Sequence, residues 1–275
     1  MDEARNLNLA NWEERAAIHL GHGGYDLSSH RAGMGHLDDI VANDLGDVAG
    51  RQVLHLQCHI GHDSIALAQR GASVVGVDFS PTAIEAARQL ASECNIPNAT
   101  FIQSDVYAAP DVLADHAGSY DLVFTTWGTI CWLPDLQRWA NAIRFFLKPG
   151  GDLYFANAHP VALVFDDIGG SADGEGRPGW LMPYFEREPQ IFDEATDYTD
   201  PSARLFNSRT VQWVHPLADI LAALKGANLH LDWLREHRQV TWRMFPGLIR
   251  EGEGLWTWPH RAWLPLAISL LAKAI

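Results

Sequence analysis

The sequence is poor in basic residues and in cysteine. It holds 20 Lys and Arg against 34 Asp and Glu, a formal net charge of −14, and the basic residues form no cluster. Because phosphate backbones are bound through clustered Lys and Arg, nucleic acid is not expected as a partner. The three cysteines, Cys58, Cys94 and Cys131, form no CxxC pair. Neither a disulfide framework nor a thiolate zinc site is therefore expected.

Long apolar segments are also missing. The longest one near the end of the chain, 264–271, is interrupted by Pro265 and Ser269, whereas a membrane-spanning helix needs about 20 apolar residues. Residues 1–15 are polar and acidic and lack the apolar core of a signal peptide. We therefore expect a cytoplasmic protein that does not contact membranes, and the sequence leaves open whether it is a monomer or a homodimer.

Strand-like and helix-like segments alternate from residue 52 to about 158. Helices are predicted at 63–70, at 81–94 with Ser80 as N-cap, and after Asp135, the last one ending in a turn at 148–151. Strands are predicted between them, at 53–57, 73–77, 100–103, 121–125 and 153–156. This alternation is typical of a parallel sheet with helices on both faces.

The C-terminal part continues the pattern with a predicted helix at 216–226. Alternating residues at 229–233 then indicate a strand, and we interpret 264–271 as a further strand that closes the sheet in the antiparallel direction. The predicted fold class is therefore α/β, a Rossmann-like, doubly wound and mostly parallel sheet. Residues 46–158 and 216–275 would form this domain, and its C-terminal strand would be antiparallel.

Two segments lie outside the alternation. Residues 1–45 hold Trp12, Tyr25 and four histidines, and we interpret them as a helical cover over the C-terminal edge of the sheet. Residues 159–215 hold a glycine-rich stretch at 169–176, followed by five aromatic residues: Trp180, Tyr184, Phe185, Phe192 and Tyr198. An insertion of this length and composition is more typical of a lid over an active site than of a linker.

The residues after each strand are the place to look for a ligand site, because open parallel sheets bind ligands beyond the carboxyl ends of their strands. His55 and Gln57 interrupt a first strand that should be almost entirely apolar. A polar ligand beside the strand would explain them, and Gly61 would let the backbone approach that ligand.

Two carboxylates follow the next strands. Asp78 is placed to accept hydrogen bonds from the two hydroxyls of a ribose, although an acid near a helix start is a common alternative. Asp105 would accept from an adenine amino group, with Val106 packed on the ring. An acid at a strand end is common, so Asp105 alone is a weak signal.

Taken together, these segments resemble the class I S-adenosylmethionine (SAM)-dependent methyltransferases over about residues 50–160. The stretch VLHLQCHIGHDSIALAQRGASVVGVDFSPTAIEAAR is similar to that family's glycine loop, second strand and following helix. SDVY is similar to its adenine segment, YDLVFTTWGTICWLPD to its fourth strand, and FLKPGGDLYFA to its fifth. The LHLQCHIGHD wording and the opening NWEERAAIH resemble a bacterial branch whose substrates are largely unassigned.

The resemblance implies SAM as methyl donor, S-adenosylhomocysteine (SAH) as product, and a small-molecule acceptor. It also implies a set of cofactor contacts, which comprises His55, Gln57, Cys58, His59, Gly61, Asp63, Asp78, Phe79, Asp105, Val106 and Thr126. The family loop usually carries an acid on the strand and three glycines. Here His55 stands in the place of the acid, Gln57 and His59 replace the first two glycines, and only Gly61 remains.

Without an acid at residue 55, the methionine ammonium of SAM must find backbone carbonyls or other side chains. Asp63 is one candidate, and capping the following helix is its equally good alternative role. The cluster of His55, His59 and His62 with Asp63 is not expected to bind a metal ion. Its side chains straddle a strand and a loop, and no HExxH motif is present.

A methyl sulfonium is already activated, so the protein must mainly align an acceptor with it and exclude water. Aromatic faces stabilise such a cation; Trp127, Trp132 and Tyr25 are the candidates, with core packing as the alternative. His159 is the candidate base for a hydroxyl or acidic-carbon acceptor. A structural hydrogen bond to the insertion is its alternative role.

Three functions are compatible with the sequence. The leading one is methyl transfer to a small molecule enclosed by the insertion. The second is a SAM-binding protein of the same fold that catalyses another step or only binds. The third is an NAD-dependent oxidoreductase, which shares the glycine loop and the strand-end acid but would require the full GxGxxG that this loop lacks.

Overall fold

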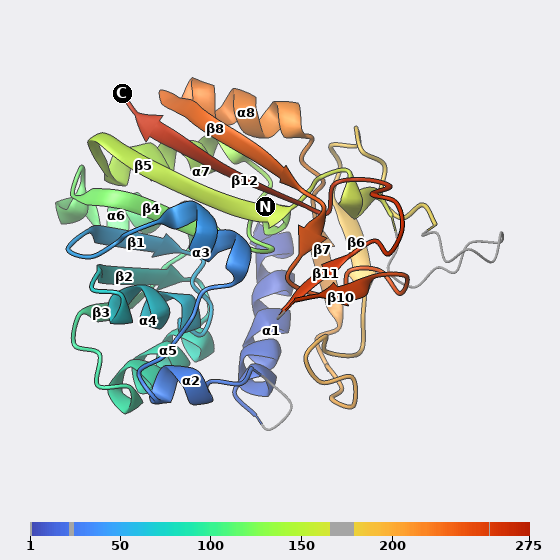
Figure 1. The fold of residues 1–275 in the computed structure, drawn as a ribbon, viewed down its shortest axis with the longest axis horizontal. Coiled ribbons are helices and arrows are strands. Elements are labelled where there is room, and N and C mark those ends of the chain that lie inside the picture. The colour runs from blue at the N-terminus through green and yellow to red at the C-terminus, as the bar shows by residue number, and fades with distance from the viewer. Residues whose placement is uncertain (1, 22–24, 166–178, 253) are drawn as a thin grey trace.

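A seven-stranded sheet forms the centre of the computed structural model, which describes residues 2–21, 25–165, 179–252 and 254–275 (Figure 1). The strand order is β3-β2-β1-β4-β5-β12-β8. All neighbouring strands pair in parallel except β12, which is antiparallel to both β5 and β8. The bounds are β1 (Gln52–Leu56), β2 (Ser73–Asp78), β3 (Ala99–Gln103), β4 (Tyr120–Thr126), β5 (Leu147–Ala158), β8 (Leu229–His237) and β12 (Ala267–Ala274).

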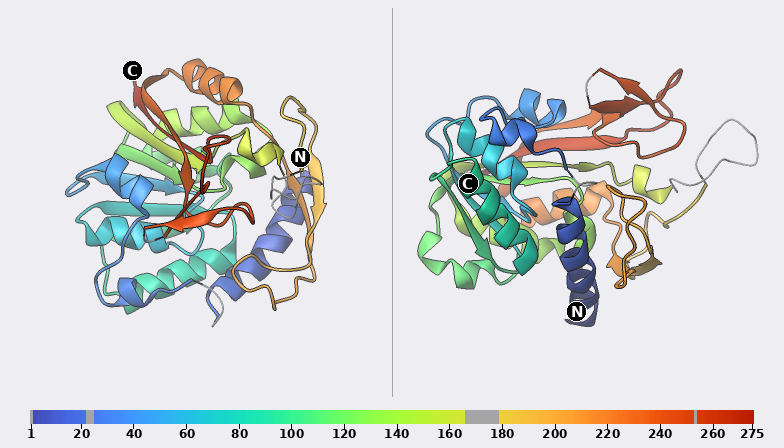
Figure 2. Two further views of the ribbon diagram at one scale, coloured as in Figure 1. Left: turned by 45° about the vertical axis from the view of Figure 1, so that its right-hand side comes forward. Right: turned by 90° about the horizontal axis from the view of Figure 1, so that it is seen from below.

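Helices cover both faces of this sheet (Figure 2). On one face, buried residues of α3 (Asp39–Leu45), α4 (His62–Gln69) and α5 (Pro81–Glu93) share a core with Val53. On the other face, residues of α6 (Ala109–Val112), α7 (Leu136–Phe146) and α8 (Leu217–Gly226) pack around Leu54. The predicted α/β fold with an antiparallel C-terminal strand is therefore confirmed. The strands and helices alternate along the chain because helices bury both faces of the central strands.

The predicted helix caps are present, but one predicted turn is wrong. Ser80 Oγ accepts from the amide of Ala83 at 3.0 Å, and Asp135 Oδ1 accepts from that of Arg138 at 2.9 Å. The turn expected at 148–151 belongs to β5, because the chain passes from α7 directly into that strand. Its pairing with β4 is irregular at this point.

The N-terminal helix α1 (Asp2–His19) lies between the C-terminal edge of the sheet and the hairpin of β6 (Gln190–Asp193) and β7 (Arg209–Gln212) (Figures 1 and 2). The short helix α2 (Ser28–Arg31) follows it. The hairpin is part of the insertion predicted at 159–215. The glycine-rich stretch 169–176 lies outside the described residues, so its interpretation as part of a lid stays a prediction.

A second small sheet, between β8 and β12, was not predicted. It consists of β9 (Gln239–Val240), β10 (Ile249–Glu251) and β11 (Leu255–Thr257), in the order β10-β11-β9. Phe245 and Trp258 stack in its core with ring centroids 5.4 Å apart. Short 3₁₀ helices complete the secondary structure at Ala114–His116, Ile130–Trp132 and Ala162–Val164. In the described ranges, every helix is too short or too polar to cross a membrane.

Gly61 precedes α4 in a left-handed conformation, with φ of 76°. A Cβ at this position would lie 2.7 Å from Phe101 Cε1 and 2.8 Å from Ala87 Cβ. Packing against α5 and β3 therefore explains this glycine, and an approach to a ligand is not needed to explain it. The residue fixes where the helix after β1 begins, and thereby the loop in front of it.

We expect Gly61→Ala to destabilise the protein more than Gly50→Ala does. Both glycines are left-handed, at φ of 76° and 75°, but a Cβ on Gly50 meets nothing within 4 Å. The shared backbone penalty is about 1 kcal/mol, and overpacking adds about 1 kcal/mol or more at Gly61 only. Urea unfolding of both variants measures the difference, and equal losses would contradict the packing explanation.

Candidate active site

The carboxyl ends of four parallel strands lie side by side at one edge of the sheet. The register pairs Leu56 of β1 with Val77 of β2, and Asp78 with Gln103 of β3. On the other side of β1, His55 pairs with Phe124 of β4. The segments that follow these strands therefore meet at one rim, as expected for an open parallel sheet.

The loop after β1 keeps two left-handed residues although neither is a glycine. Gln57 has φ of 58° and His59 has φ of 50°, a conformation that costs a non-glycine residue about 1–2 kcal/mol. These are the two positions at which the sequence lacks the family's first glycines. Such strain persists only where the surroundings hold it. Here Cys58 N donates to Val77 O at 3.0 Å, and Gly61 N donates to Cys58 O at 2.9 Å.

Asp78 ties this loop to β2. Its Oδ2 accepts from the amide of His59 at 2.8 Å and its Oδ1 from the amide of Ser80 at 3.0 Å. Burial raises the pKa of Asp78 to about 6. Each carboxylate oxygen keeps a further lone pair, so the group can accept two hydroxyl protons in addition. Phe79 is half-buried beside it, and its carbonyl accepts from Gln103 Nε2 at 3.4 Å.

Three buried polar atoms at this rim lack a partner in the described part of the chain: Gln57 Oε1, Thr129 Oγ1 and His62 Nδ1. The amide nitrogen of Gln57 is used, since it donates to Thr129 O at 2.9 Å. Buried polar atoms are normally satisfied, and an orphaned acceptor calls for an explanation such as a ligand. Gln57 Oε1 and Thr129 Oγ1 together fit a ligand that carries an ammonium group.

Asp105 and Val106 have partners within the protein at the end of β3. Asp105 Oδ2 is paired with Arg5 Nε of α1 at 2.8 Å, and its Oδ1 accepts from the amide of Tyr107 at 2.8 Å. Val106 is buried in the core beneath α7. Asp105 therefore ties α1 to the end of β3, and an adenine contact by either residue stays a prediction.

The polar side chains of the first strand and helix have other partners than a ligand. His55 Nδ1 lies 2.8 Å from Ser64 Oγ of α4, and burial lowers the pKa of His55 to about 4. Ser64 therefore satisfies Nδ1 of His55, and a ligand contact by this residue stays a prediction. Cys58 is buried against Gly76, whose added Cβ would lie 2.9 Å from the Cys58 sulfur.

Asp63 does not cap α4, because its carboxylate accepts no amide proton of that helix. Gly61 occupies the N-cap position, and no side chain caps this helix. Asp63 Oδ2 instead lies 3.5 Å from Thr126 Oγ1, and its Oδ1 lies 3.3 Å from His62 Nε2. Asp63 and Thr126 thereby join the end of β4 to the start of α4. An ammonium contact by Asp63 stays a prediction.

The predicted aromatic residues do gather at this rim. Trp127, with φ of 42°, donates from Nε1 to Asp38 Oδ2 at 2.7 Å. Tyr25 stacks on His62 with ring centroids 5.0 Å apart, and its hydroxyl lies 2.9 Å from that of Tyr198. The third candidate, Trp132, meets the edge of Trp12 of α1, with centroids 5.4 Å apart.

His159 has contacts that fit its structural role, and its role as a base stays a prediction. Its Nδ1 accepts from the amide of Val161 at 3.1 Å, so the neutral ring carries its proton on Nε2. That nitrogen lies 3.0 Å from Glu236 Oε1 on β8. Nδ1 is therefore occupied within the start of the insertion, whereas Nε2 contacts β8 as an ion pair without hydrogen-bond geometry.

Sequence reasoning missed a buried network beside His59. Asp197 of the insertion pairs with Arg15 Nη1 at 2.9 Å and with His19 Nε2 at 3.1 Å. His19 Nδ1 in turn lies 2.7 Å from His59 Nε2. In the sequence, the only sign of this network is the group of four histidines within residues 1–45. Over the described ranges, no group of three or more His, Cys, Asp or Glu side chains is arranged to hold a metal ion.

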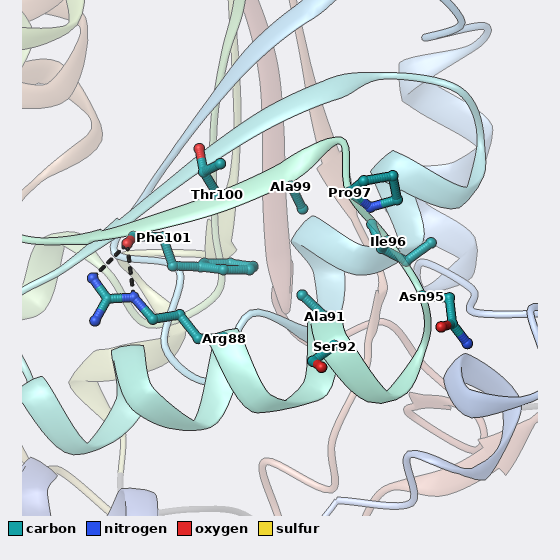
Figure 3. Close-up of a pocket in the computed structure, with 9 residues that line it drawn as sticks. All are labelled: Arg88, Ala91, Ser92, Asn95, Ile96, Pro97, Ala99, Thr100 and Phe101. Carbon is teal, nitrogen blue, oxygen red and sulfur yellow. Dashed lines mark hydrogen bonds between the residues drawn. The ribbon is translucent and has the colours of Figure 1, made fainter.

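A pocket with a volume of about 740 Å³ lies away from this rim, between α5 and β3 (Figure 3). Its lining comes from residues 88–101, on the side of β3 where that strand begins. The Arg88 guanidinium turns away to the Phe101 carbonyl, at 2.8 Å from Nη2. Ser92, Asn95 and Thr100 also line this pocket (Figure 3), but it lies away from the carboxyl ends of the parallel strands, so the rim at the opposite edge remains the candidate site.

The chain is similar to known proteins over part of its length. Residues 53–151 match the family described as a methyltransferase domain. The chain is 31% identical over 126 residues to the ubiquinone biosynthesis O-methyltransferase of Acinetobacter baumannii, a match covering 45% of this chain and 52% of that protein. The corresponding protein of Saccharophagus degradans is 31% identical over 150 residues, 53% of this chain and 61% of its own. The chain thus spans about half the length of the curated relatives it matches.

Solved structures share the fold over most of the chain. An S-adenosylmethionine-dependent methyltransferase from Mesorhizobium loti superposes with a TM-score of 0.57 at 19% identity, covering 85% of this chain and 95% of that one. A geranyl diphosphate C-methyltransferase from Streptomyces coelicolor, solved with S-adenosyl-L-homocysteine, gives 0.52 at 12% identity, covering 86% and 78%. Residues 53–151 therefore match a methyltransferase domain, and the chain has the fold of the class I SAM-dependent methyltransferases.

Proposed function

We propose that this protein transfers a methyl group from SAM to a small-molecule acceptor at the rim formed by β1 to β4. One observation carries the proposal: the loop after β1 keeps its two left-handed residues without glycines, and Asp78 is fixed to that loop through the His59 amide. A backbone form retained against its intrinsic cost is a mark of a functional site. It falls inside the segment that matches the methyltransferase domain.

Different residues of the rim would bind different parts of SAM. Asp78 would accept from the ribose hydroxyls, and Gln57 Oε1 with Thr129 Oγ1 would take the methionine ammonium that has no acid at residue 55. Trp127 and Tyr25 would exclude water from the reacting groups. SAM, when bound, supplies a methyl group that is already electrophilic, so positioning is the main contribution of the protein.

The acceptor is proposed to be a small molecule with a hydroxyl group. The curated relatives are named as O-methyltransferases, and the net charge of −14 disfavours nucleic acid. A cytoplasmic location and a monomeric or homodimeric state also stay predictions.

The two alternatives differ in what supports them. An NAD-dependent oxidoreductase would have a fully parallel sheet and a GxGxxG loop, whereas β12 is antiparallel between β5 and β8. A protein that binds SAM without transferring its methyl group has the same fold. Its only support is the substituted loop, in which Gln57 and His59 replace glycines.

Calorimetric titration with SAM, SAH and NAD tests the proposal. We expect SAM and SAH to bind with dissociation constants on the order of micromolar, and NAD to show no binding at concentrations about a thousandfold higher. Incubation with SAM and hydroxyl or amine acceptors, followed by detection of SAH, separates transfer from binding alone. Binding of NAD without a response to SAM would overturn the proposed function.

A further inference from the structure

A chain of hydrogen-bonding side chains links three distant segments at the rim. It runs from Asp197 in the insertion, through His19 at the end of α1, to His59 in the loop after β1. The nitrogen–oxygen distance is 3.1 Å and the nitrogen–nitrogen distance is 2.7 Å. The side chains of Asp197 and His19 are completely buried, while His59 is half-buried.

The donors around Asp197 determine where each proton lies. Its carboxylate accepts from Arg15 Nη1 at 2.9 Å, and from the amide and hydroxyl of Thr199 at 2.7 and 2.6 Å. As an acceptor only, it requires the proton of His19 on Nε2. His19 Nδ1 is then an acceptor, so His59 must donate from Nε2. The lone pair of His59 is thereby placed on Nδ1, which has no hydrogen-bonding partner in the described segments.

Burial keeps both rings neutral. It lowers the pKa of His19, and it lowers the pKa of His59 well below the usual histidine value, with the charge of His19 acting in the same direction. Burial opposes ionisation of Asp197, but hydrogen bonds from Thr199 outweigh it and lower that pKa. The titratable and charged groups that face the two rings are Arg15, Tyr25, His62, Asp78, Asp197 and Tyr198.

His59 stands where an acceptor would meet the cofactor. Its backbone amide binds Asp78, the proposed ribose ligand, and its ring meets the edge of Trp12 with centroids 5.2 Å apart. Beyond Tyr25, the ring of Tyr198 is 60% exposed and marks the solvent side of this cluster. A methyl acceptor that enters past Tyr198 would therefore contact His59 before it contacts the strands of the sheet.

We propose that His59 Nδ1 is the general base of the methyl transfer, and that His19 and Asp197 are positioning residues that fix its tautomer. The acceptor class is then a phenol or enol, whose hydroxyl is acidic enough for a weakly basic imidazole. The acceptor O–H bond breaks with its proton passing to His59 Nδ1, while the oxygen bonds the methyl group released from the sulfonium. The proton then leaves to solvent. This inference rests on the proposed function.

The tautomers can be measured without any acceptor. In ¹⁵N-labelled protein, long-range imidazole spectra should place the His59 proton on Nε2. In Asp197→Asn, the Thr199 donors retain the amide oxygen at the Oδ1 position, so the new amide nitrogen takes the Oδ2 position, where it loses the Arg15 bond and donates to His19 Nε2. Both rings must then reverse, and the His59 proton moves to Nδ1. Asp200→Asn is the matched control, because Asp200 is the neighbouring acid of the same turn and bonds Ser202 rather than a histidine.

The second measurement uses 4-nitrophenol, whose absorption reports its ionisation, added to the SAH-loaded protein. Because neutral His59 Nδ1 accepts from the phenol hydroxyl and so stabilises its un-ionised form, the bound phenol should ionise with an apparent pKa raised by about one unit, a factor of about ten. His59→Gln and Asp197→Asn should abolish that shift, and Asp200→Asn should keep it. SAH affinity, measured separately, reports on the proposed function.

A wild-type His59 that carries its proton on Nδ1 would overturn the inference, as would a folded Asp197→Asn variant with unchanged tautomers. The same holds if 4-nitrophenol does not bind, or ionises equally in wild type and in His59→Gln. Loss of SAH binding in the wild type would instead contradict the proposed function. The two failures are therefore distinguishable.

Discussion

Asp78→Ala should weaken SAM binding about a thousandfold, which corresponds to about 4 kcal/mol. Hydrogen bonds to a charged group contribute about 1.5–3 kcal/mol each, and the proposed site would lose two of them at the ribose. The substitution also removes the acceptor of the His59 amide, which lies 2.8 Å from Asp78 Oδ2 and fixes the left-handed loop. Calorimetric titration of the variant with SAM measures the loss.

The matched control is Asp121→Ala at the opposite edge of the sheet. Asp121 accepts from the amide of Gln52 at 2.8 Å and pairs with Lys148 at 2.7 Å, so it makes the same kinds of contact without lying near the rim. SAM affinity should be unchanged in it, and circular dichroism should show that both variants fold. Unchanged affinity in a folded Asp78→Ala variant would remove the basis for the proposed function.

The same carboxyl makes SAM binding depend on pH. Burial raises the pKa of Asp78 to about 6 in the free protein, from a reference of 3.8. A raised carboxyl pKa gives a contribution to folding stability that is complete below 3.8 and is lost as pH rises through about 6. The pH dependence of SAM affinity has the opposite sign, because the ribose hydroxyls donate hydrogen bonds to the ionised carboxylate of Asp78. SAM affinity should therefore rise between pH 5 and 7, and this rise should be absent in Asp78→Asn.

The fold could be predicted because its signals are local. The central strands are largely apolar on both faces, helices such as α7 have one apolar stripe, and caps such as Ser80 and Asp135 mark where helices begin. The strand-end residues could be placed at one rim from topology alone. That step needs only the rule that parallel strands share an edge, and the observed register agrees with it.

What could not be predicted depends on contacts between distant segments. His55 interrupts the apolar pattern of its strand, and its hydrogen-bonding partner is Ser64, nine residues away on the covering helix. The periodicity of the sequence gives no sign of this pairing. The pairing of His19 with Asp197 joins residues 178 apart. The small sheet of β9 to β11 consists of strands of only two or three residues, which are too short to show a period.

Helix α1 was predicted as a cover, but its polar character has a cause that only the structure shows. It is buried on two sides, against the rim and against the insertion. Asn8 links the helix to the insertion through two hydrogen bonds. Its Nδ2 donates to Val211 O at 2.8 Å, and its Oδ1 accepts from Val211 N at 2.8 Å. The side chain thus pairs with the outer edge of β7 as another strand would.

Asn8→Leu should destabilise the protein by about 3–4 kcal/mol. Leucine has a similar volume but leaves the amide and the carbonyl of Val211 buried without partners, at about 1–3 kcal/mol each. Urea unfolding measures the total, and hydrogen exchange should show faster exchange of the Val211 amide. Asn141→Leu is the control, since Asn141 is exposed on α7 and accepts only from Gln137. Its effect should stay within about 0.5 kcal/mol.

The positions of the amides that exchange faster in Asn8→Leu distinguish a local loss of the Asn8–Val211 pairing from a general loss of stability. If α1 holds the insertion through Asn8, protection should fall first at β6 and β7, while the amides of β1 and β4 stay protected up to global unfolding. Uniform loss of protection across the sheet would mean that α1 and the central sheet unfold together. An unchanged Val211 amide would contradict the pairing itself. In the first case the cover over the rim can open without unfolding the sheet, which gives an acceptor a route to His59.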